Sequence, residues 1–513
     1  MAAGFAAAQR AGSGSLTTSP QDGRETAPLL PHSEVMPIMI GLMLGMLLGA
    51  LDGTIVSTAL PTIGRALHNE VNLPWVVTAY LLAAVAVTPL YGKLSDIYGR
   101  RAIMVFAIGI FIVGSVACAL APSLPLLALA RGIQGAGGGG LISLAQTIIA
   151  DIVSPRDRGR YQVHIASVFA TSSLAGPILG GFLSEHIHWT AIFWINVPLG
   201  LLTLTIVNRR LAALPKPDRK HRLDILGSVL LILSSAALLL ALSWGGTRFP
   251  WASPEIAGLA GLAIVSGLVF ARHVSRAAEP LIPLAVLGNP VVKTATLAAG
   301  IAMGTLIGLS IFMPIYFESV LGFSASQSGL SLIPLSIGTV VGSTLAGRLM
   351  MRLEHYKRPP LVGLAVAVAG ALILAFGASH LPFPALAIVL FCISCGAGLT
   401  MPTSTVATQN AVARSDLGTA TATSNFFRQI GGALIVAVFG TVVFGTTGGH
   451  GSAETGHSLA GVDPALLAAA FSRLFLTASA CLILAFLFFR AMPERPLRGA
   501  EDFAPQVAEQ PGE

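Results

Sequence analysis

Residues 92–101 read Gly92-Lys93-Leu94-Ser95-Asp96-Ile97-Tyr98-Gly99-Arg100-Arg101, a short polar segment between two apolar stretches of about twenty residues each. Its glycines permit a tight turn, and its aspartate can face the positive end of a helix. Its arginines can pair with acidic side chains on neighbouring segments. The segment is therefore predicted to be a charged latch at one end of a pair of membrane helices.

The composition of the 513-residue chain is typical of a membrane protein. Hydrophobic residues make up 54% and charged residues 10%, against about 25% charged residues in a soluble globular chain. This excludes a secreted disulfide scaffold, a disordered protein and a soluble enzyme as the main interpretation. We therefore expect no enzyme activity and no cofactor. The net charge of +7 is explained by basic cytoplasmic loops, so no nucleic-acid partner is expected.

The four cysteines lie in apolar runs and have no nearby histidines or second pair to complete a metal site. Packing in the bundle explains them, and no metal site is predicted.

Apolar stretches long enough to cross the roughly 30 Å hydrocarbon core as helices recur fourteen times. We therefore predict an all-α membrane protein with fourteen transmembrane helices. The predicted spans are residues 37–58, 74–93, 102–121, 124–149, 161–183, 190–207, 223–243, 255–271, 294–317, 327–347, 361–378, 382–406, 419–445 and 466–489.

The positions of the 30 Lys and Arg residues test this topology. If both termini are cytoplasmic, 25 lie in cytoplasmic segments and only Arg65 and Arg248 in external loops. The other three, Arg131, Arg428 and Arg473, lie within spans. Such a bias follows the positive-inside rule, and one missed helix would invert it downstream. The protein is therefore predicted to be a multi-pass protein of the cell (inner) membrane.

The spans divide into two six-helix bundles separated by two inserted central helices. Two bundles around a central site suit alternating access, in which one half rocks against the other. The predicted divisions are a disordered cytoplasmic tail (1–36), an N-terminal bundle (37–208), a basic linker with the two inserted helices (209–293), a C-terminal bundle (294–490) and a cytoplasmic tail (491–513).

The spacing of residues 92–101 resembles the signature loop of the major facilitator superfamily, G-x-L-x-D-x-x-G-R-K/R. Gly92, Asp96, Gly99, Arg100 and Arg101 carry this resemblance, which implies an inner-face gating loop. Residues 347–352 occupy the equivalent place in the second half and look like a degenerate copy of the loop.

Three further stretches resemble the fourteen-span drug:proton antiporter branch of that superfamily. They are Leu51-Asp52-Gly53-Thr54 with Ala59-Leu60-Pro61, Arg131-Gly132-Ile133-Gln134-Gly135, and Gly176-Pro177-Ile178-Leu179-Gly180-Gly181, the last with Ser172 in place of the first glycine of the antiporter motif. The resemblance covers about residues 37–490 and implies proton coupling through Arg131.

Asp52 and Arg131 also have a physical interpretation of their own. An ionised carboxylate in an apolar run is costly unless it is paired, protonated or hydrated, so Asp52 is a candidate proton site. Arg131 stays protonated, so its role would be electrostatic, as the partner of a carboxylate. The alternatives are that Asp52 only caps a helix end near the outer interface, and that Arg131 only bonds to helix carbonyls.

The glycine-proline motif predicts a kinked and tightly packed helix, because Pro177 removes a backbone donor and Gly176, Gly180 and Gly181 remove bulk. A seal or hinge between the halves and a generic membrane-helix kink are both compatible with it.

Glu318 lies near the external end of its span and is a candidate second proton-coupling residue, although an ordinary interfacial glutamate would have the same position. Candidate substrate-pocket residues are aromatic and polar positions on central spans, which suit hydrophobic or cationic organic molecules. Most aromatic residues in such spans pack or face lipid. The candidates are Tyr80, Gln146, Phe169, Tyr316, Phe317, Asn425 and Phe426.

The sequence therefore predicts a monomeric secondary transporter that exports hydrophobic or cationic compounds in exchange for protons. Its partners would be small substrates, protons and the lipid bilayer. A dedicated exporter of one metabolite, antibiotic or lipid, a proton symporter working as an importer, and a non-transporting membrane sensor on the same scaffold remain open. No phosphate-binding loop is present, which disfavours direct drive by ATP.

Overall fold

Long α-helices that run side by side make up the chain in the computed structural model, which describes residues 32–68, 72–213, 223–246, 248–353, 355–446 and 463–497. The first helix begins at His32, so residues 32–36 are helical, whereas the sequence predicts a disordered tail there. The rest of that predicted tail and most of the C-terminal one lie outside the described residues.

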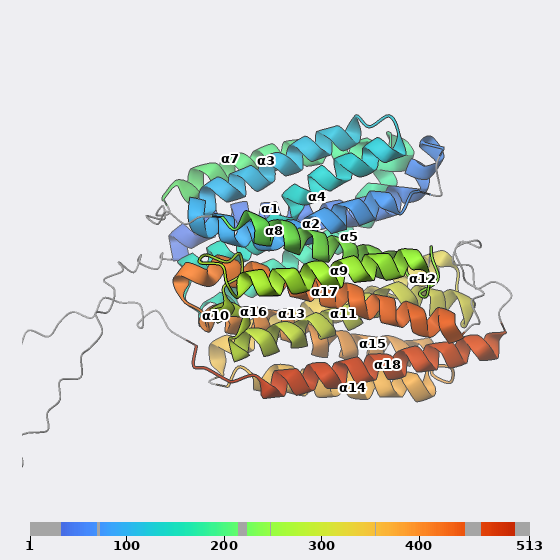
Figure 1. Ribbon diagram of the computed structural model, residues 1–513. Helices are drawn as coiled ribbons and strands as arrows, with labels where there is room; N and C mark the ends of the chain where they lie inside the picture. Colours follow the sequence, from blue (N-terminus) through green and yellow to red (C-terminus); the bar gives the residue numbers. More distant parts are fainter. Residues whose placement is uncertain are drawn as a thin grey trace, which may run out of the picture.

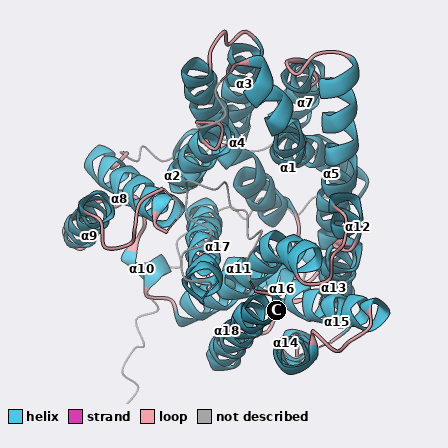
Figure 2. Cartoon of the chain, turned by 90° about the vertical axis from the view of Figure 1, so that its right-hand side faces the viewer, coloured by secondary structure: helices cyan, strands magenta, loops and turns pink. Residues whose placement is uncertain are grey.

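One group of helices comes from the N-terminal half and lies at the top of Figures 1 and 2. It comprises α1 (His32–Ala66), α2 (Trp75–Tyr98), α3 (Arg100–Ala119), α4 (Leu124–Ile152), α5 (Arg158–His186), α6 (Ala191–Trp194) and α7 (Asn196–Arg210), followed by the short 3₁₀ helix η1 (Leu211–Ala213).

A second group comes from the C-terminal half and lies below the first. Helix α8 lies beside α2 and α17, and α9 packs on the outer side of α8 (Figure 2). The remaining helices are α8 (Ile225–Trp244), α9 (Pro254–Val274), α10 (Leu284–Leu287), α11 (Pro290–Ser319), α12 (Ala325–Leu330), α13 (Ile333–Arg352), α14 (Arg358–Gly377), α15 (Phe383–Gly398), α16 (Thr400–Asn410), η2 (Arg414–Asp416), α17 (Leu417–Thr446) and α18 (Pro464–Ala491).

Within the described ranges, 13 helices are long and apolar enough to cross a membrane. The predicted span 124–149 is not among them, although it corresponds to α4, a helix of 29 residues. Arg131, Gln134 and a run of glycines lower the apolarity of α4. The fourteenth crossing and the cytoplasmic location of the termini therefore stay predictions.

Three predicted spans are interrupted rather than continuous, and in each a proline explains the position of the break. A proline has no N–H to donate to the carbonyl four residues earlier, and its ring clashes with that carbonyl. In each case the helical segment ends four residues before the proline. The pairs of helix end and proline are Trp194 and Pro198, Leu330 and Pro334, and Gly398 and Pro402. At the third break the hydroxyl of Ser343 donates to the freed Gly398 carbonyl at 3.2 Å, which meets the demand for internal hydrogen bonds within a membrane.

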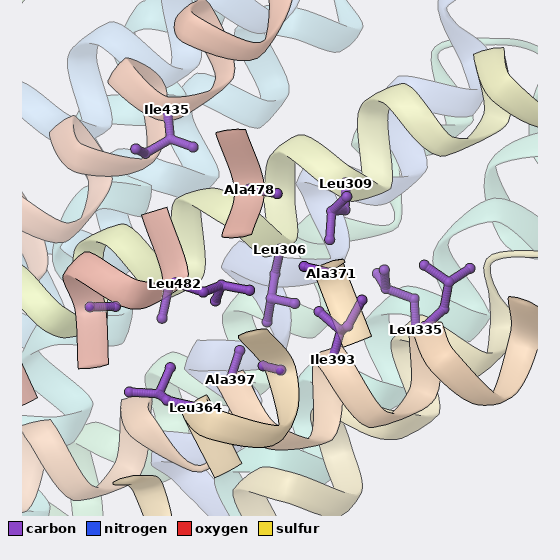
Figure 3. Packing of buried hydrophobic residues seen from close by; sticks show 14 of the residues in the cluster. Leu306, Leu309, Leu335, Leu364, Ala371, Ile393, Ala397, Ile435, Ala478 and Leu482 are labelled. Carbon is purple, nitrogen blue, oxygen red and sulfur yellow. The ribbon is translucent and has the colours of Figure 1, made fainter. Parts of the chain in front are cut away.

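The C-terminal half has a continuous apolar core to which α11, α13, α14, α15, α17 and α18 all contribute (Figure 3). Leu306 of α11, Ile393 of α15 and Leu482 of α18 meet there and are nearly inaccessible to solvent. The N-terminal half has its own core, with Met39, Phe111 and Leu141 fully buried.

Glycines let α4 lie unusually close to its neighbours α2 and α3. A Cβ atom built on Gly135 would lie 2.3 Å from the carbonyl oxygen of Tyr80, and one built on Gly137 would lie 2.4 Å from the amide nitrogen of Phe111. Both contacts are with backbone, which cannot give way as a side chain can. Close packing of this kind takes the place of hydrophobic driving force between membrane helices.

The inserted helices α8 and α9 are joined to each other at their inner ends, the ends nearest residues 92–101. Asp224 caps α8 by accepting from the N–H of Gly227 at 2.8 Å, and it pairs with His273 of α9 at 2.7 Å. The N–H of Leu281 donates to the same carboxylate at 3.2 Å. Burial alone would raise the pKa of Asp224, but these hydrogen bonds and the nearby His273 lower it overall. One ionised carboxylate therefore holds both helices and the segment that follows.

We expect Gly135→Ala to destabilise the protein, because the added methyl group would overpack the α2–α4 contact at a cost of about 1–3 kcal/mol. Gly132 is the matched control, since a Cβ there would meet nothing within 4 Å. Gly132→Ala should leave the apparent melting temperature of the detergent-solubilised protein unchanged or slightly raised. Equal melting temperatures for the two variants would contradict the packing described here.

Candidate functional site

Asp52 lies inside the N-terminal half and is paired with Arg131. Its Oδ2 accepts from Arg131 Nη1 at 2.6 Å, and both side chains have at most 1% of their surface exposed. Its Oδ1 accepts from Gln134 Nε2 at 2.8 Å and from Asn196 Nδ2 at 3.1 Å. Two helices besides α1, α4 and α7, therefore bind this carboxylate, and the charge of Arg131 neutralises it within the bundle.

Arg131 is held by contacts beyond the ion pair. Its Nε donates to the Val76 carbonyl at 3.0 Å, and its Nη1 also donates to Gln134 Oε1 at 2.6 Å. The guanidinium lies 4.3 Å from the ring centroid of Tyr80, a distance at which a cation interacts favourably with an aromatic face. Arg131 therefore links α4 to α1 and to the outer part of α2.

The sequence indicated the two charged members of this cluster but not the polar ones. Gln134 stands three residues after Arg131, one helical turn away on the same face. Asn196 is a strongly polar residue in the apolar stretch 190–207. A polar residue in an apolar stretch indicates a bonding partner inside the bundle. This signal could have placed Gln134 and Asn196 beside Asp52 and Arg131.

The cluster offers a way to couple protonation to helix movement. Since an arginine keeps its proton, protonating Asp52 would leave a buried positive charge with weaker compensation. Arg131 already contacts Gln134 and the Val76 carbonyl, which could retain it when Asp52 is neutral. Gain of a proton would then loosen α1 from α4 while Arg131 stays attached to α2.

Glu318, the second predicted proton-coupling residue, lies elsewhere. It is exposed in the last turn of α11, and the described hydrogen bonds of the Asp52 cluster do not include it. Its predicted role in coupling therefore has no geometric link to Asp52 in this structure.

The loop of residues 92–101 joins the two halves at the inner end of the bundle. Asp96 Oδ2 accepts from the backbone N–H of Thr419 at 2.9 Å and from its hydroxyl at 2.7 Å. Thr419 lies in the first turn of α17, where a negative charge is favourable. Arg100 donates to Asp96 at 2.5 Å and to Asp151 at 2.6 Å.

The glycines of this loop serve two different needs. Gly99 has φ of 90°, which an L side chain rarely adopts, and it connects α2 directly to α3. Gly92 lies against α17: a Cβ on it would be 2.7 Å from the Gly418 carbonyl oxygen. Arg101 instead donates to Asn208 Oδ1 of α7 at 2.8 Å, within its own half.

A second contact between the halves forms at the same end. Gly159 at the start of α5 faces Gly347 of α13, and a Cβ on Gly159 would be 2.4 Å from the Gly347 carbonyl oxygen. Arg158 donates to Gln409 Oε1 at 3.3 Å, and Gln409 Nε2 donates to the Gln146 carbonyl at 3.3 Å. The inner end is therefore closed.

The glycine-proline motif contacts α1, which belongs to the same half. A Cβ on Gly176 would be 2.0 Å from the Thr54 hydroxyl oxygen, and one on Gly180 would be 2.2 Å from that of Thr58. Gly181 faces open space and Pro177 is exposed within α5. The motif thus packs α5 on α1, and its glycines do not form a contact between the halves.

The outer half of the bundle contains a cavity of about 750 Å³ between the two halves and the inserted helix α8. Residues of α2, α8, α11 and α17 line it, together with the loop between α8 and α9. Volumes of 300–1,000 Å³ are typical of sites for small organic molecules.

None of the seven predicted pocket residues lines this cavity. Tyr316 and Phe317 lie in the C-terminal core, with the Tyr316 ring 5.1 Å from that of Phe471. Asn425 donates to Gln146 at 3.1 Å across the two halves. The ring of Tyr80 packs against the guanidinium of Arg131. Phe169 and Phe426 pack in apolar clusters. Their role in substrate binding stays a prediction.

The geometry and the motifs agree with a comparison against known families. The sequence profile of the Major Facilitator Superfamily matches residues 42–436. This chain belongs to that superfamily. It is a multi-pass membrane protein of this family, which is a family of transporters rather than enzymes.

Relatives in this family include named efflux proteins. Multidrug resistance protein 3 of Bacillus subtilis is 34% identical over 405 residues, 79% of each chain. The multidrug transporter protein MdtP of the same organism is 32% identical over 396 residues, 77% of this chain and 72% of the relative. An uncharacterized MFS-type transporter of Mycobacterium tuberculosis is 35% identical over 430 residues, which are 84% of this chain but only 62% of the relative.

Solved structures of the superfamily share the fold. The proton:xylose symporter XylE has a TM-score of 0.63 at 16% identity, covering 92% of this chain and 98% of its own. The human organic anion transporter MFSD10 has a TM-score of 0.62 at 18% identity, covering 90% of this chain and all of its own. At these identities the likeness concerns the fold alone.

Asp52→Leu should destabilise this transporter by about 3–5 kcal/mol, because it leaves the charge of Arg131 buried and unpaired. The double variant Asp52→Leu/Arg131→Met should recover much of that loss, since it removes both charges. Denaturant unfolding of the detergent-solubilised protein measures both. Additive losses in the double variant would show that the two residues do not depend on each other.

Asp96→Asn should weaken the closure of the inner end, because it removes the charge that caps α17 from the opposite half. Tyr98 and Ala413 are both exposed at the inner end and can carry spin labels. In pulsed electron paramagnetic resonance, the distribution of distances between the two labels should then gain a longer component. Arg101→Gln is the control, since Arg101 bonds within its own half. A distance distribution unaffected by Asp96→Asn, or changed equally by the control, would refute the latch.

Proposed function

We propose that this transporter exports hydrophobic or cationic organic compounds in exchange for protons. It would act as a monomer in the cell membrane with both termini cytoplasmic, by alternating access of the two halves. The observation that carries the proposal is the fully buried Asp52–Arg131 pair at 2.6 Å. A buried carboxylate in a transporter is a default candidate for a proton relay.

The names of the relatives support efflux. Two Bacillus subtilis proteins at 32–34% identity are named as multidrug proteins, and a Dothistroma relative is named an efflux pump at 34% identity. The arrangement of the structure supports release to the outside, since the inner end is closed and the large cavity lies in the outer half.

The proposed cycle uses the proton to reset the transporter. With the inner end closed, substrate leaves through the outer half and Asp52 takes up a proton. Neutral Asp52 releases α1 from Arg131, and the halves rock so that the inner contacts separate. The proton is lost to the cytoplasm and substrate enters. One pH unit supplies about 1.4 kcal/mol per proton for this cycle.

Asp52→Asn should abolish substrate-driven proton movement, because the amide cannot carry the proton, while Asn can still accept hydrogen bonds from Gln134 and Asn196. The assay uses inside-out vesicles with an acidified lumen, a pH-sensitive dye and a panel of neutral and cationic lipophilic compounds. In the unmodified protein, active compounds should remove protons from the lumen.

Glu185→Gln is the matched control, since Glu185 is an exposed carboxylate in α5 and should leave exchange intact. Glu318→Gln in the same assay tests its predicted coupling role, which requires a loss of exchange. Full exchange in Asp52→Asn would refute the coupling assignment. Further acidification of the lumen when substrate is added to the medium would indicate a symporter instead, because a symporter carries protons in the same direction as its substrate.

A further inference from the structure

The inserted helix α8 contacts both halves of the bundle. Leu231 of α8 packs with Val85 of α2 and Phe426 of α17 in one apolar cluster. At its outer end the ring of Trp244 meets that of Trp75 of α2 edge to face, with centroids 5.4 Å apart. Together with the Asp224 contacts at the inner end, these hold α8 along the junction of the halves (Figure 2).

The outer cavity has α8 as one of its walls. Leu239 and Leu242 of α8 and Trp251 of the following loop face Leu81 of α2 and Val436 of α17 across it. The cavity is therefore bounded by both halves and by the inserted helix. Its shape must change when the halves move relative to each other, as expected of a site on a transport path.

The lining of this cavity is apolar and uncharged. Among the described residues that line it there is no Asp, Glu, Lys, Arg or His, and its polar side chains are confined to Thr78, Ser243, Gln429, Thr441 and the indole N–H of Trp251. A charged group moved from water into such a cavity loses its hydration without gaining a counter-charge. The rings of Trp251 and Phe312 could attract a cation, but this attraction is smaller than the loss of hydration.

We infer that this cavity, of which α8 forms one wall, binds uncharged hydrophobic compounds of drug size and discriminates against cations. As a statement about exported substrates, the inference rests on the proposed function and narrows its hydrophobic or cationic compounds to the uncharged ones. As a statement about binding, it does not depend on the proposed function. It gives the inserted helix α8 a role in binding in addition to its packing.

The test compares two probes of equal shape and different charge: 6-bromo-1-methylnaphthalene, which is neutral, and 6-bromo-1-methylquinolinium, which is cationic. Bromine quenches indole fluorescence on contact, and Trp251 lines the cavity. The purified full-length transporter in nanodiscs, without any proton gradient, should show saturable quenching by the neutral probe. The cationic probe should bind at least tenfold more weakly.

A cavity-filling variant tests the role of α8. Leu239→Phe/Leu242→Phe should weaken binding of the neutral probe at least fivefold, because it fills the α8 side of the cavity. Leu262→Phe/Leu268→Phe is the matched control on exposed positions of α9 that do not line the cavity, and it should leave binding unchanged.

Equal binding of the two probes would overturn the charge selection, and absence of saturable quenching by the neutral probe would overturn the site. Neutral-probe binding that survives in Leu239→Phe/Leu242→Phe would overturn the role of α8. If that variant does not fold, the comparison of charges in the unmodified protein still decides the first point. Because the assay needs no gradient, its outcome is independent of whether Asp52 couples protons.

Discussion

The neutralisation of Asp52 by Arg131 is the constraint around which the N-terminal half is built. Two opposite charges buried in a helical bundle are tolerated only if geometry and further hydrogen bonds compensate their lost hydration. Gln134 and Asn196 supply those bonds to the carboxylate, and the Val76 carbonyl supplies one to the guanidinium. Helices α1, α2, α4 and α7 must therefore approach one point. The glycines of α4 let its backbone come close enough to α2 for this to happen.

The closure of the inner end repeats one arrangement twice. The inner end of α2 meets the start of α17 through Gly92 and Gly418, and the inner end of α13 meets the start of α5 through Gly347 and Gly159. This is the relation expected of an internal repeat. The two copies differ at one place, because Asp96 caps α17 whereas Met351, four residues after Gly347, contributes an apolar contact near Gly159. The carboxylate cap therefore belongs to the contact of α2 with α17, whereas near the contact of α13 with α5 the charged side chain that bonds across the halves is Arg158, which donates to Gln409.

Charged residues of the site could be identified from the sequence, but the residues that surround them could not. Asp52, Arg131 and Asp96 stand out because a charge is rare in or beside apolar spans. Gln134 and Asn196 were missed because a hydropathy average hides single amides. The breaks before Pro198, Pro334 and Pro402 were missed because counting apolar spans considers hydrophobicity alone. It does not consider that a proline leaves the carbonyl four residues earlier without its hydrogen bond.

Other features depend on tertiary packing, which span patterns do not encode. Tyr316 is aromatic and lies near the outer end of its predicted span, yet it packs in the C-terminal core rather than lining the cavity. Leu239 and Leu242 look like ordinary lipid-facing residues until α8 is placed at the junction of the halves. Neither the cavity nor the residues that line it could therefore be derived from the sequence.

Helix α2 connects the buried pair to the inner closure. Its outer part contacts Arg131 through the Val76 carbonyl and the Tyr80 ring, and its inner end carries Gly92 and Asp96. At 1.5 Å per residue, the twenty residues from Val76 to Asp96 span about 30 Å. Because α2 is one continuous helix over this length, a small change in its tilt at Arg131 moves Asp96 relative to α17. A single continuous helix, which contains Pro89 between the two sites, is thus in contact with both the proposed proton site and the latch, and its position is what the two sites have in common.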